Sequence, residues 1–101
     1  MPTITVKLDA KRAARLTRWA RRARVPKSDV VRALIDRAGL KGLQVGGAAI
    51  SAAHANFIVS DGQATARDIR TLVETVRRTV RERFGVELRD EVVFLGNKEG
   101  E

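Results

Sequence analysis

The sequence predicts an α+β protein whose elements follow the order β-α-α-β-β-α-β. Two periodicities carry this prediction. Short stretches alternate polar residues with apolar, often β-branched ones, which is typical of a strand with one buried face. Longer stretches repeat apolar residues every three or four positions, which is typical of an amphipathic helix. With 101 residues the chain has room for one domain or two very small ones.

The first third of the chain predicts a strand followed by two helices. Residues 3–8 form the strand, and Asp9 is a good N-cap for a helix over residues 10–23. Pro26 ends that helix, because the residue before a proline is pushed out of the helical region. Ser28 can cap the second helix. The apolar face of this second helix consists of Val31, Leu34, Ile35 and Ala38.

Two strands follow, over residues 43–51 and 56–60, joined by a turn. The pair Gly46-Gly47 lies inside the first of them and predicts a bulge or a close backbone approach.

A long helix is predicted over residues 66–84. Thr65 can cap its start and Gly85 ends it. Its apolar positions repeat at helical spacing, so one side should face a core. Residues 86–95 contain the last strand.

Composition excludes several kinds of site. There is no cysteine, and the single His54 cannot form a zinc site within one chain, so no metal site is predicted. No apolar run approaches the ~20 residues of a membrane span, and the start carries no signal peptide. We therefore expect a cytoplasmic protein without a membrane partner.

The net charge of +8 is concentrated in the first third of the chain. Residues 1–32 hold ten Lys and Arg against two acids, whereas residues 33–101 hold ten against ten. Such a basic block indicates a polyanion partner, nucleic acid before membrane. A solvated arginine-rich helix face is the alternative interpretation.

The predicted first strand needs a partner, because it has no neighbour within its own thirty residues and edge backbone groups must be satisfied. The same strand of a second copy supplies one, which predicts a homodimer through the N-terminal strand. The outward face of this two-stranded ribbon carries Thr3, Thr5 and Lys7. A ribbon of this kind fits the DNA major groove, where Thr and Lys side chains can contact base edges. An ordinary polar strand face is the alternative.

The stretch TITVKLDAKRAARLTRWARRARVPKSDVVRALIDRA resembles the ribbon-helix-helix family, which includes the Arc, MetJ and CopG repressors and many antitoxins. The resemblance covers roughly residues 2–38. It implies that the outward strand residues read bases of double-stranded DNA. It also implies that the start of the second helix holds a phosphate through the backbone of Lys27, Ser28 and Asp29, a task for which a helix N-terminus is physically suited.

Residues 34–96 resemble a different family, the C-terminal domain of UDP-N-acetylenolpyruvoylglucosamine reductase (MurB). The segments that carry this resemblance are AGLKGLQVGGA, HANFIV, ATARDI and RERFGVEL, followed by EV and FLG. In that family the domain packs over the substrate, while two preceding domains hold flavin. A glutamate in the final segment acts as general acid, and this role falls on Glu91.

Several departures separate this sequence from that family. Ala49 stands where Gln is usual, Ala52-Ala53 where charged residues are usual, and Val93 where Arg is usual. The flavin domains are absent from these residues, and so is the serine that protonates the intermediate. Because one carboxylate without a hydride donor cannot reduce anything, we expect no enzyme activity, no catalytic residue, no cofactor and no flavin partner.

The two resemblances overlap at ALIDRAG, so the sequence is interpreted as a chimera. Its parts are a ribbon-helix-helix unit over residues 1–36, a reductase-like β-β-α-β segment over 37–96 and a tail over 97–101. The predicted function is that of a dimeric DNA-binding protein, a repressor or antitoxin-like. The alternatives are a natural or engineered fusion with no selected activity beyond folding, and a fragment of a flavoenzyme that lacks its flavin domains.

Overall fold

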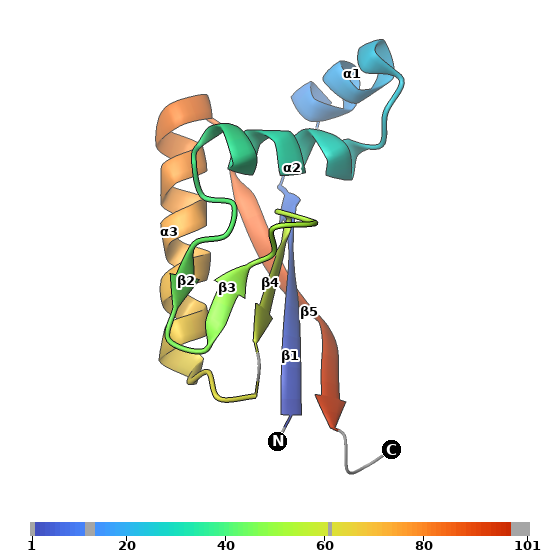
Figure 1. The fold of residues 1–101 in the computed structure, drawn as a ribbon. Coiled ribbons are helices and arrows are strands. Elements are labelled where there is room, and N and C mark those ends of the chain that lie inside the picture. Colours follow the sequence, from blue (N-terminus) through green and yellow to red (C-terminus); the bar gives the residue numbers. More distant parts are fainter. Residues whose placement is uncertain (1, 12–13, 61, 98–101) are drawn as a thin grey trace.

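The computed structural model describes residues 2–11, 14–60 and 62–97 (Figure 1). Its elements are β1 (Pro2–Ala10), α1 (Ala14–Ala23), α2 (Lys27–Arg37), β2 (Gln44–Val45), β3 (Ala48–Ile50), β4 (Phe57–Ser60), α3 (Ala66–Phe84) and β5 (Leu88–Asn97). The predicted α+β class is confirmed. The predicted order β-α-α-β-β-α-β is wrong in one respect, because three strands rather than two lie between α2 and α3.

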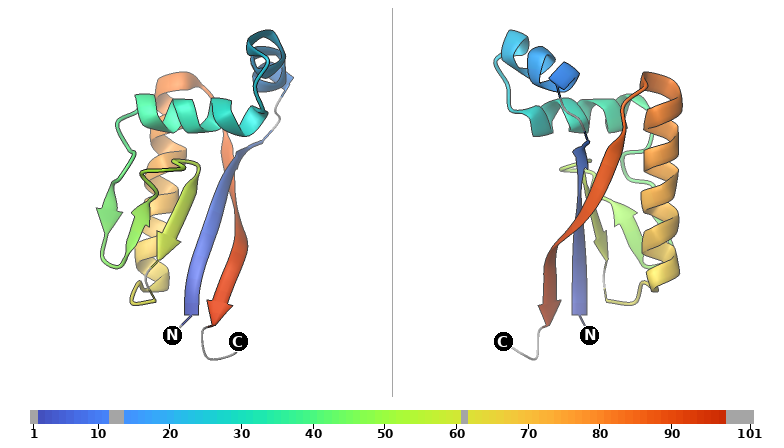
Figure 2. Two further views of the ribbon diagram at one scale, coloured as in Figure 1. Left: turned by 45° about the vertical axis from the view of Figure 1, so that its right-hand side comes forward. Right: turned by 180° about the vertical axis from the view of Figure 1, so that it is seen from behind.

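All five strands belong to one antiparallel sheet with the order β2-β3-β4-β1-β5. The first strand of the chain therefore lies between β4 and β5. Lys7 is opposite Phe57 of β4 on one side and Glu91 of β5 on the other. Helix α3 runs along one face of the sheet, α2 crosses its end, and α1 lies beyond α2 (Figures 1 and 2).

The core lies between the sheet and the helices α2 and α3. The alternation of strand side chains places Val6, Leu8 and Ala10 of β1 in this core. The largest of the fully buried side chains are Leu8, Leu16, Ile35, Ile50, Ile58, Leu72 and Leu88. Since these residues come from both ends of the chain, the core joins β1 to the segment that contains β2–β5.

Helix α3 has the bounds that the sequence predicts. The Thr65 side chain accepts a hydrogen bond from the backbone N–H of Asp68, and the Asp68 carboxylate accepts one from the N–H of Thr65, each at 3.0 Å. This capping box satisfies two backbone donors at the helix start. Gly85 ends the helix in the left-handed conformation, with φ of 69°, which glycine adopts without a side-chain clash.

Two predicted caps are wrong. The Asp9 carboxylate accepts a hydrogen bond from Ala10 within β1, and α1 begins only at Ala14, so Asp9 extends the strand rather than starting the helix. Helix α2 starts after Pro26 without a side-chain cap, and Ser28 already lies inside its first turn.

The predicted strand over residues 43–51 is also wrong in detail. It divides into β2 and β3, and Gly46-Gly47 forms the two-residue hairpin turn between them rather than a bulge. Gly46 has φ of 57°, which a tight hairpin needs and which glycine tolerates.

The predicted ribbon between two copies is not formed, because both edges of β1 are already paired. β4 pairs with β1 along Thr5–Lys7, and β5 pairs with it along Pro2–Ala10. No edge of this strand is left to take the same strand of a second copy. Among the described helices, none is long and apolar enough to cross a membrane.

Candidate functional site

One face of the sheet is covered by α3, and the other is open. The open face is defined by the side chains that alternate with the buried ones. In the described part of the strands these are Thr5, Lys7, Asp9, Gln44, Ala49, Phe57, Val59, Arg89 and Glu91. Val59 at the centre is 39% exposed, which is unusual for an apolar side chain in a middle strand. This face is therefore a candidate surface for contact with another molecule or domain.

Glu91, the residue that matches the general acid of the reductase family, lies on this open face. Its neighbours Asp90 and Val92 point to the other side, where they line a pocket with α3. Lys7 is directly opposite Glu91 across the β1–β5 pair. The Glu91 side chain is exposed and has no ion pair within the described residues, so its carboxyl group can meet a ligand.

Ala49 lies on the same face as Glu91. It is opposite Val59, which in turn is opposite Thr5. From β3 to β5 is three strand spacings, roughly 14 Å. The two positions that the family resemblance singles out thus share a face, although only an extended ligand could contact both. Ala52 and Ala53 are exposed in the bend before β4, and the side chain of Val93 is outside the described residues.

A pocket of about 410 Å³ lies on the opposite side, between α3 and the strands β1 and β5. Its floor is apolar, with Val6, Val73 and Val92. An ion pair at 3.7 Å between Arg77 and Asp90 lies at its rim. The sheet separates this pocket from the Glu91 side chain, so the pocket cannot place a ligand against that carboxyl group.

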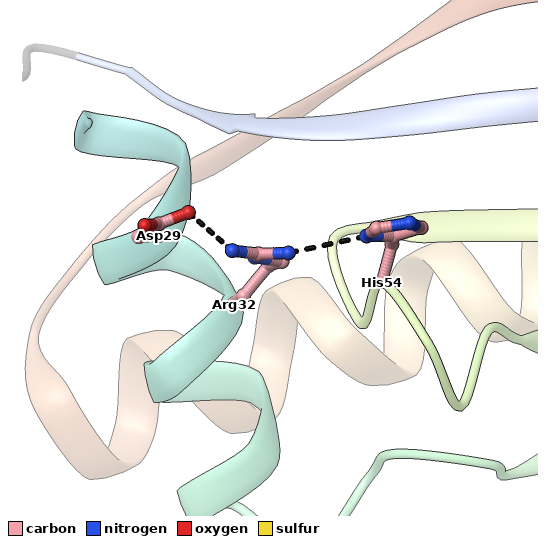
Figure 3. A network of polar contacts seen from close by, with 3 residues as sticks. All are labelled: Asp29, Arg32 and His54. Carbon is pink, nitrogen blue, oxygen red and sulfur yellow. Dashed lines mark hydrogen bonds and ion pairs between the residues drawn. The ribbon is translucent and has the colours of Figure 1, made fainter. Parts of the chain in front are cut away.

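A polar network ties α2 to the turn before β4 (Figure 3). The Arg32 guanidinium donates to the Asp29 carboxylate and, at 3.1 Å, to Nδ1 of His54. The His54 ring lies edge-on to Phe57, with 6.3 Å between ring centroids. All three polar side chains are at least partly exposed. This arrangement gives His54 a structural hydrogen bond rather than a position next to Glu91.

The six residues predicted to bind DNA lie on two elements. Thr3, Thr5 and Lys7 are in β1, inside the five-stranded sheet, and the Thr3 side chain is outside the described residues. The other three, Lys27, Ser28 and Asp29, form the first turn of α2. Lys27 makes an ion pair at 3.6 Å with Asp9 of β1, while Asp29 is engaged by Arg32.

The described residues do not fit a flavin dinucleotide. The only adjacent glycine pair in the sequence, Gly46-Gly47, forms a hairpin turn and not a phosphate-binding loop. A Cβ atom added to Gly46 would lie 2.2 Å from a carboxylate oxygen of Asp68. The space beside this glycine is thus filled by an anionic group, which repels a diphosphate.

Fold and site together define a small α+β domain with one bare sheet face that carries an exposed carboxylate. The sequence profile of the UDP-N-acetylenolpyruvoylglucosamine reductase C-terminal domain matches residues 22–95. The chain belongs to this family.

Curated relatives agree with this assignment. UDP-N-acetylenolpyruvoylglucosamine reductase of Desulfosudis oleivorans is 62% identical over 63 residues, which are 62% of this chain and 20% of the relative. Reductase 2 of Symbiobacterium thermophilum is 56% identical over 72 residues, 71% of this chain and 23% of the relative. The Bacillus velezensis reductase is 47% identical over 73 residues, which are 72% of this chain and 24% of the relative. The chain thus spans about a fifth to a quarter of the length of these relatives.

These findings overturn the DNA-binding interpretation. The family match starts at residue 22 and runs through α2, which the ribbon-helix-helix interpretation claimed as its own second helix. The prediction of a transcription regulator that binds double-stranded DNA and pairs with a second copy through β1 is wrong. The DNA-binding role predicted for Thr3, Thr5, Lys7, Lys27, Ser28 and Asp29 therefore loses its support. The expectations of no enzyme activity and of no flavin partner are contradicted at the level of the family, because the relatives are named as reductases.

Sequence reasoning missed two features of the site. It placed Lys7 on a DNA-reading ribbon, whereas the structure sets it opposite Glu91. It also missed the contact between the Gly46 turn and Asp68. Both features join segments that are far apart in the chain. The only sequence signal for them was the alternation of residues 3–8, which indicates a buried face but does not identify the neighbouring strand.

Proposed function

We propose that this chain is the substrate-side, C-terminal part of a UDP-N-acetylenolpyruvoylglucosamine reductase and that Glu91 is its general acid. The observation that carries the proposal is the position of Glu91. An exposed carboxyl group on the open sheet face, with α3 on the far side, is accessible to a substrate held between this face and another domain.

In this function the chain's residues hold and deliver a proton. The Glu91 carboxyl oxygen donates a proton to the substrate as the enolpyruvyl group is reduced, and a group positioned in this way contributes about 10²–10⁴-fold in rate. The hydride donor has to come from polypeptide other than the described residues, because these do not fit a flavin. Because the proton is transferred only as hydride arrives, the chain by itself is expected to bind the substrate but to carry out neither the hydride transfer nor the protonation.

The first test transfers the chain into a relative. The C-terminal segment of the Desulfosudis oleivorans reductase is replaced by the whole chain, and reduction of UDP-N-acetylenolpyruvoylglucosamine is followed with and without Glu91→Gln. We expect kcat of the hybrid to fall by at least ~100-fold in the variant. Glu82→Gln, the same change on exposed α3, is the matched control and should leave kcat unchanged. Equal rates for the hybrid with and without Glu91→Gln would refute the proposed role.

A second test concerns Ala49, where the family usually has Gln. A restored amide on the open face adds about one hydrogen bond to the substrate, about 0.5–1.5 kcal/mol. Ala49→Gln should therefore lower KM of the hybrid by roughly 2- to 10-fold. Ala53→Gln, in the exposed bend, is the control. An unchanged KM would mean that the substrate does not reach β3.

A further inference from the structure

Helix α1 carries a cluster of cations that the proposed reaction does not use. Between Asp9 and Asp29 the sequence has eight Lys and Arg and no acidic residue. The exposed arginines on α1 and directly after it, in the part of the chain that the structure describes, are Arg18, Arg21, Arg22 and Arg24. No ion pair among the described residues includes any of these four guanidinium groups. Their positive charge is therefore available to an anionic partner.

Two buried residues fix the rotation of α1 about its axis. Leu16 and Ala20 are buried, and α1 packs mainly on α2 (Figures 1 and 2). Because an α-helix has 3.6 residues per turn, Arg18 and Arg22 lie on the side away from these two residues. Trp19 is three positions before Arg22, so the two are neighbours on the helix surface, and Trp19 is 41% exposed. An indole and several guanidinium groups thus share one exposed surface.

This surface lies at one end of the molecule. Helix α2 crosses the end of the sheet, and α1 lies beyond α2, at the end opposite to where β1 begins and β5 ends (Figure 1). The connection from α1 to α2 contains Val25, which is 37% exposed. Cations and exposed apolar side chains are therefore combined at an end of the molecule that protrudes beyond the sheet.

Arg24 keeps a cation at this end despite backbone strain. The end of α1 has the hydrogen bonds of a Schellman motif: the Val25 N–H donates to the Ala20 carbonyl at 3.0 Å, and the Arg24 N–H donates to the Arg21 carbonyl at 3.2 Å. Glycine is usual at the left-handed position of this motif. Arg24 occupies it with φ of 61°, and no other non-glycine residue in the described part has a positive φ. Strain at an exposed cation without an acidic partner indicates a function for that cation.

A lipid surface fits this combination of side chains. Guanidinium groups bind phosphates through paired N–H donors, and indole rings gather at the headgroup level of a bilayer. An anionic bilayer offers phosphates together with an apolar layer beneath them, which suits the exposed Trp19 and Val25. A nucleic-acid duplex offers phosphates without such a layer.

We propose that the outer surface of α1 is a contact site for anionic phospholipid. The residues that bind headgroup phosphates are Arg18, Arg21, Arg22 and Arg24. Trp19 and Val25 enter the headgroup layer beside them. The chain lies on the membrane surface, and none of the described helices needs to span it. The site is separate from the open sheet face and does not depend on the proposed function.

The first experiment measures binding of the full chain to sedimenting vesicles. One set is pure phosphatidylcholine, and the other contains equal amounts of phosphatidylcholine and phosphatidylglycerol. We expect binding to the anionic set alone, and less of it as salt is added. Arg18→Gln, Arg21→Gln and Arg22→Gln together should weaken binding roughly 100-fold, because each cation near an anionic surface contributes about 5-fold.

A matched variant removes the same charge elsewhere. Arg67→Gln, Arg70→Gln and Arg78→Gln together change three exposed arginines of α3. This variant should bind the anionic vesicles within about 5-fold of the unaltered chain, since charges outside the contact are screened. Equal losses for the two triple variants would show attraction by net charge alone and would overturn the proposal, as would no binding of the unaltered chain at low salt.

The second experiment uses Trp19 as the probe. It is the only tryptophan in the sequence, so its fluorescence reports on this site. On anionic vesicles its emission should shift to shorter wavelength and be quenched by lipids with brominated acyl chains, because the ring enters a less polar layer. Single-stranded RNA and polyglutamate serve as other polyanions. Tighter binding to either of them than to the vesicles at the same salt would assign the site to another class of partner and overturn the proposal.

The third experiment separates binding from folding. Arg24→Gly relieves the strain at the end of α1, so the variant should resist urea at least as well as the unaltered chain. It should nevertheless bind anionic vesicles about 5-fold more weakly. Unchanged binding would overturn the role proposed for Arg24. All three experiments use the isolated chain without substrate, so their failure is distinguishable from failure of the proposed function, which rests on the hybrid reductase.

Discussion

Gly46 and Asp68 link the β2–β3 hairpin to the start of α3. Gly46 adopts φ of 57° in the turn, and the Asp68 carboxylate occupies the space where a side chain would begin. The same carboxylate accepts the Thr65 N–H in the capping box. Because Gly46 has no side chain, the Asp68 carboxylate can lie against the turn and still cap α3.

This contact predicts that Gly46→Ala lowers the free energy of unfolding more than Gly42→Ala, in which only backbone strain is expected. Gly42 also has positive φ, 82°, but nothing lies within 4 Å of an added Cβ. Both variants should lose about 1–3 kcal/mol from backbone strain. Gly46→Ala should lose about 1 kcal/mol more, because Asp68 has to move out of its cap. Urea unfolding followed by circular dichroism measures both. Equal losses would mean that the Asp68 contact carries no energy.

At the scale of elements, α3 is the most self-contained part of the chain. Its cap, its apolar stripe and its terminal glycine are all local in sequence, and its bounds follow from them. By contrast, α1 carries the exposed cationic side chains of Arg18, Arg21 and Arg22, and Arg24 is exposed directly after its end. The positive charge that suggested a nucleic-acid partner is in part a solvated helix face, which composition alone could not distinguish from a binding surface.

The cap of α3 gives a prediction at this scale. Thr65→Ala removes the side-chain acceptor of the capping box and should lower the free energy of unfolding by about 1 kcal/mol. Thr71→Ala, at an exposed position inside the same helix, should be neutral or slightly stabilising because alanine is the better helix former. Thermal unfolding of the two variants side by side checks the difference, and a loss for Thr71→Ala as large as for Thr65→Ala would argue against the cap.

At the scale of the whole molecule, β1 decides how the two ends of the chain are joined. It lies between β4 and β5 with residues Pro2–Ala10, and its buried side chains share a core with α2 and α3. The open face and the position of Glu91 both depend on this one placement.

The two faces of β1 should therefore respond differently to truncation. Leu8 is 1% exposed, so Leu8→Ala should cost about 2–5 kcal/mol. Lys7→Ala, one residue earlier on the open face, should stay within about 0.5 kcal/mol. Denaturant midpoints of both variants measure this contrast. Similar small losses for both would mean that β1 is not packed into the core.

The sequence by itself determined the features that depend on near neighbours. These are the α+β class, the bounds and caps of α3, and a resemblance to the reductase family carried by short motifs such as AGLKGLQVGGA. Tertiary structure decided what pairs with what. The alternation of residues 3–8 indicates that one face of the strand is buried, but it does not identify the neighbouring strands. The same pattern is compatible with pairing to a second copy and with the observed pairing to β4 and β5. Strand pairing between distant segments depends on the shared core of the whole chain, and no local pattern encodes that core.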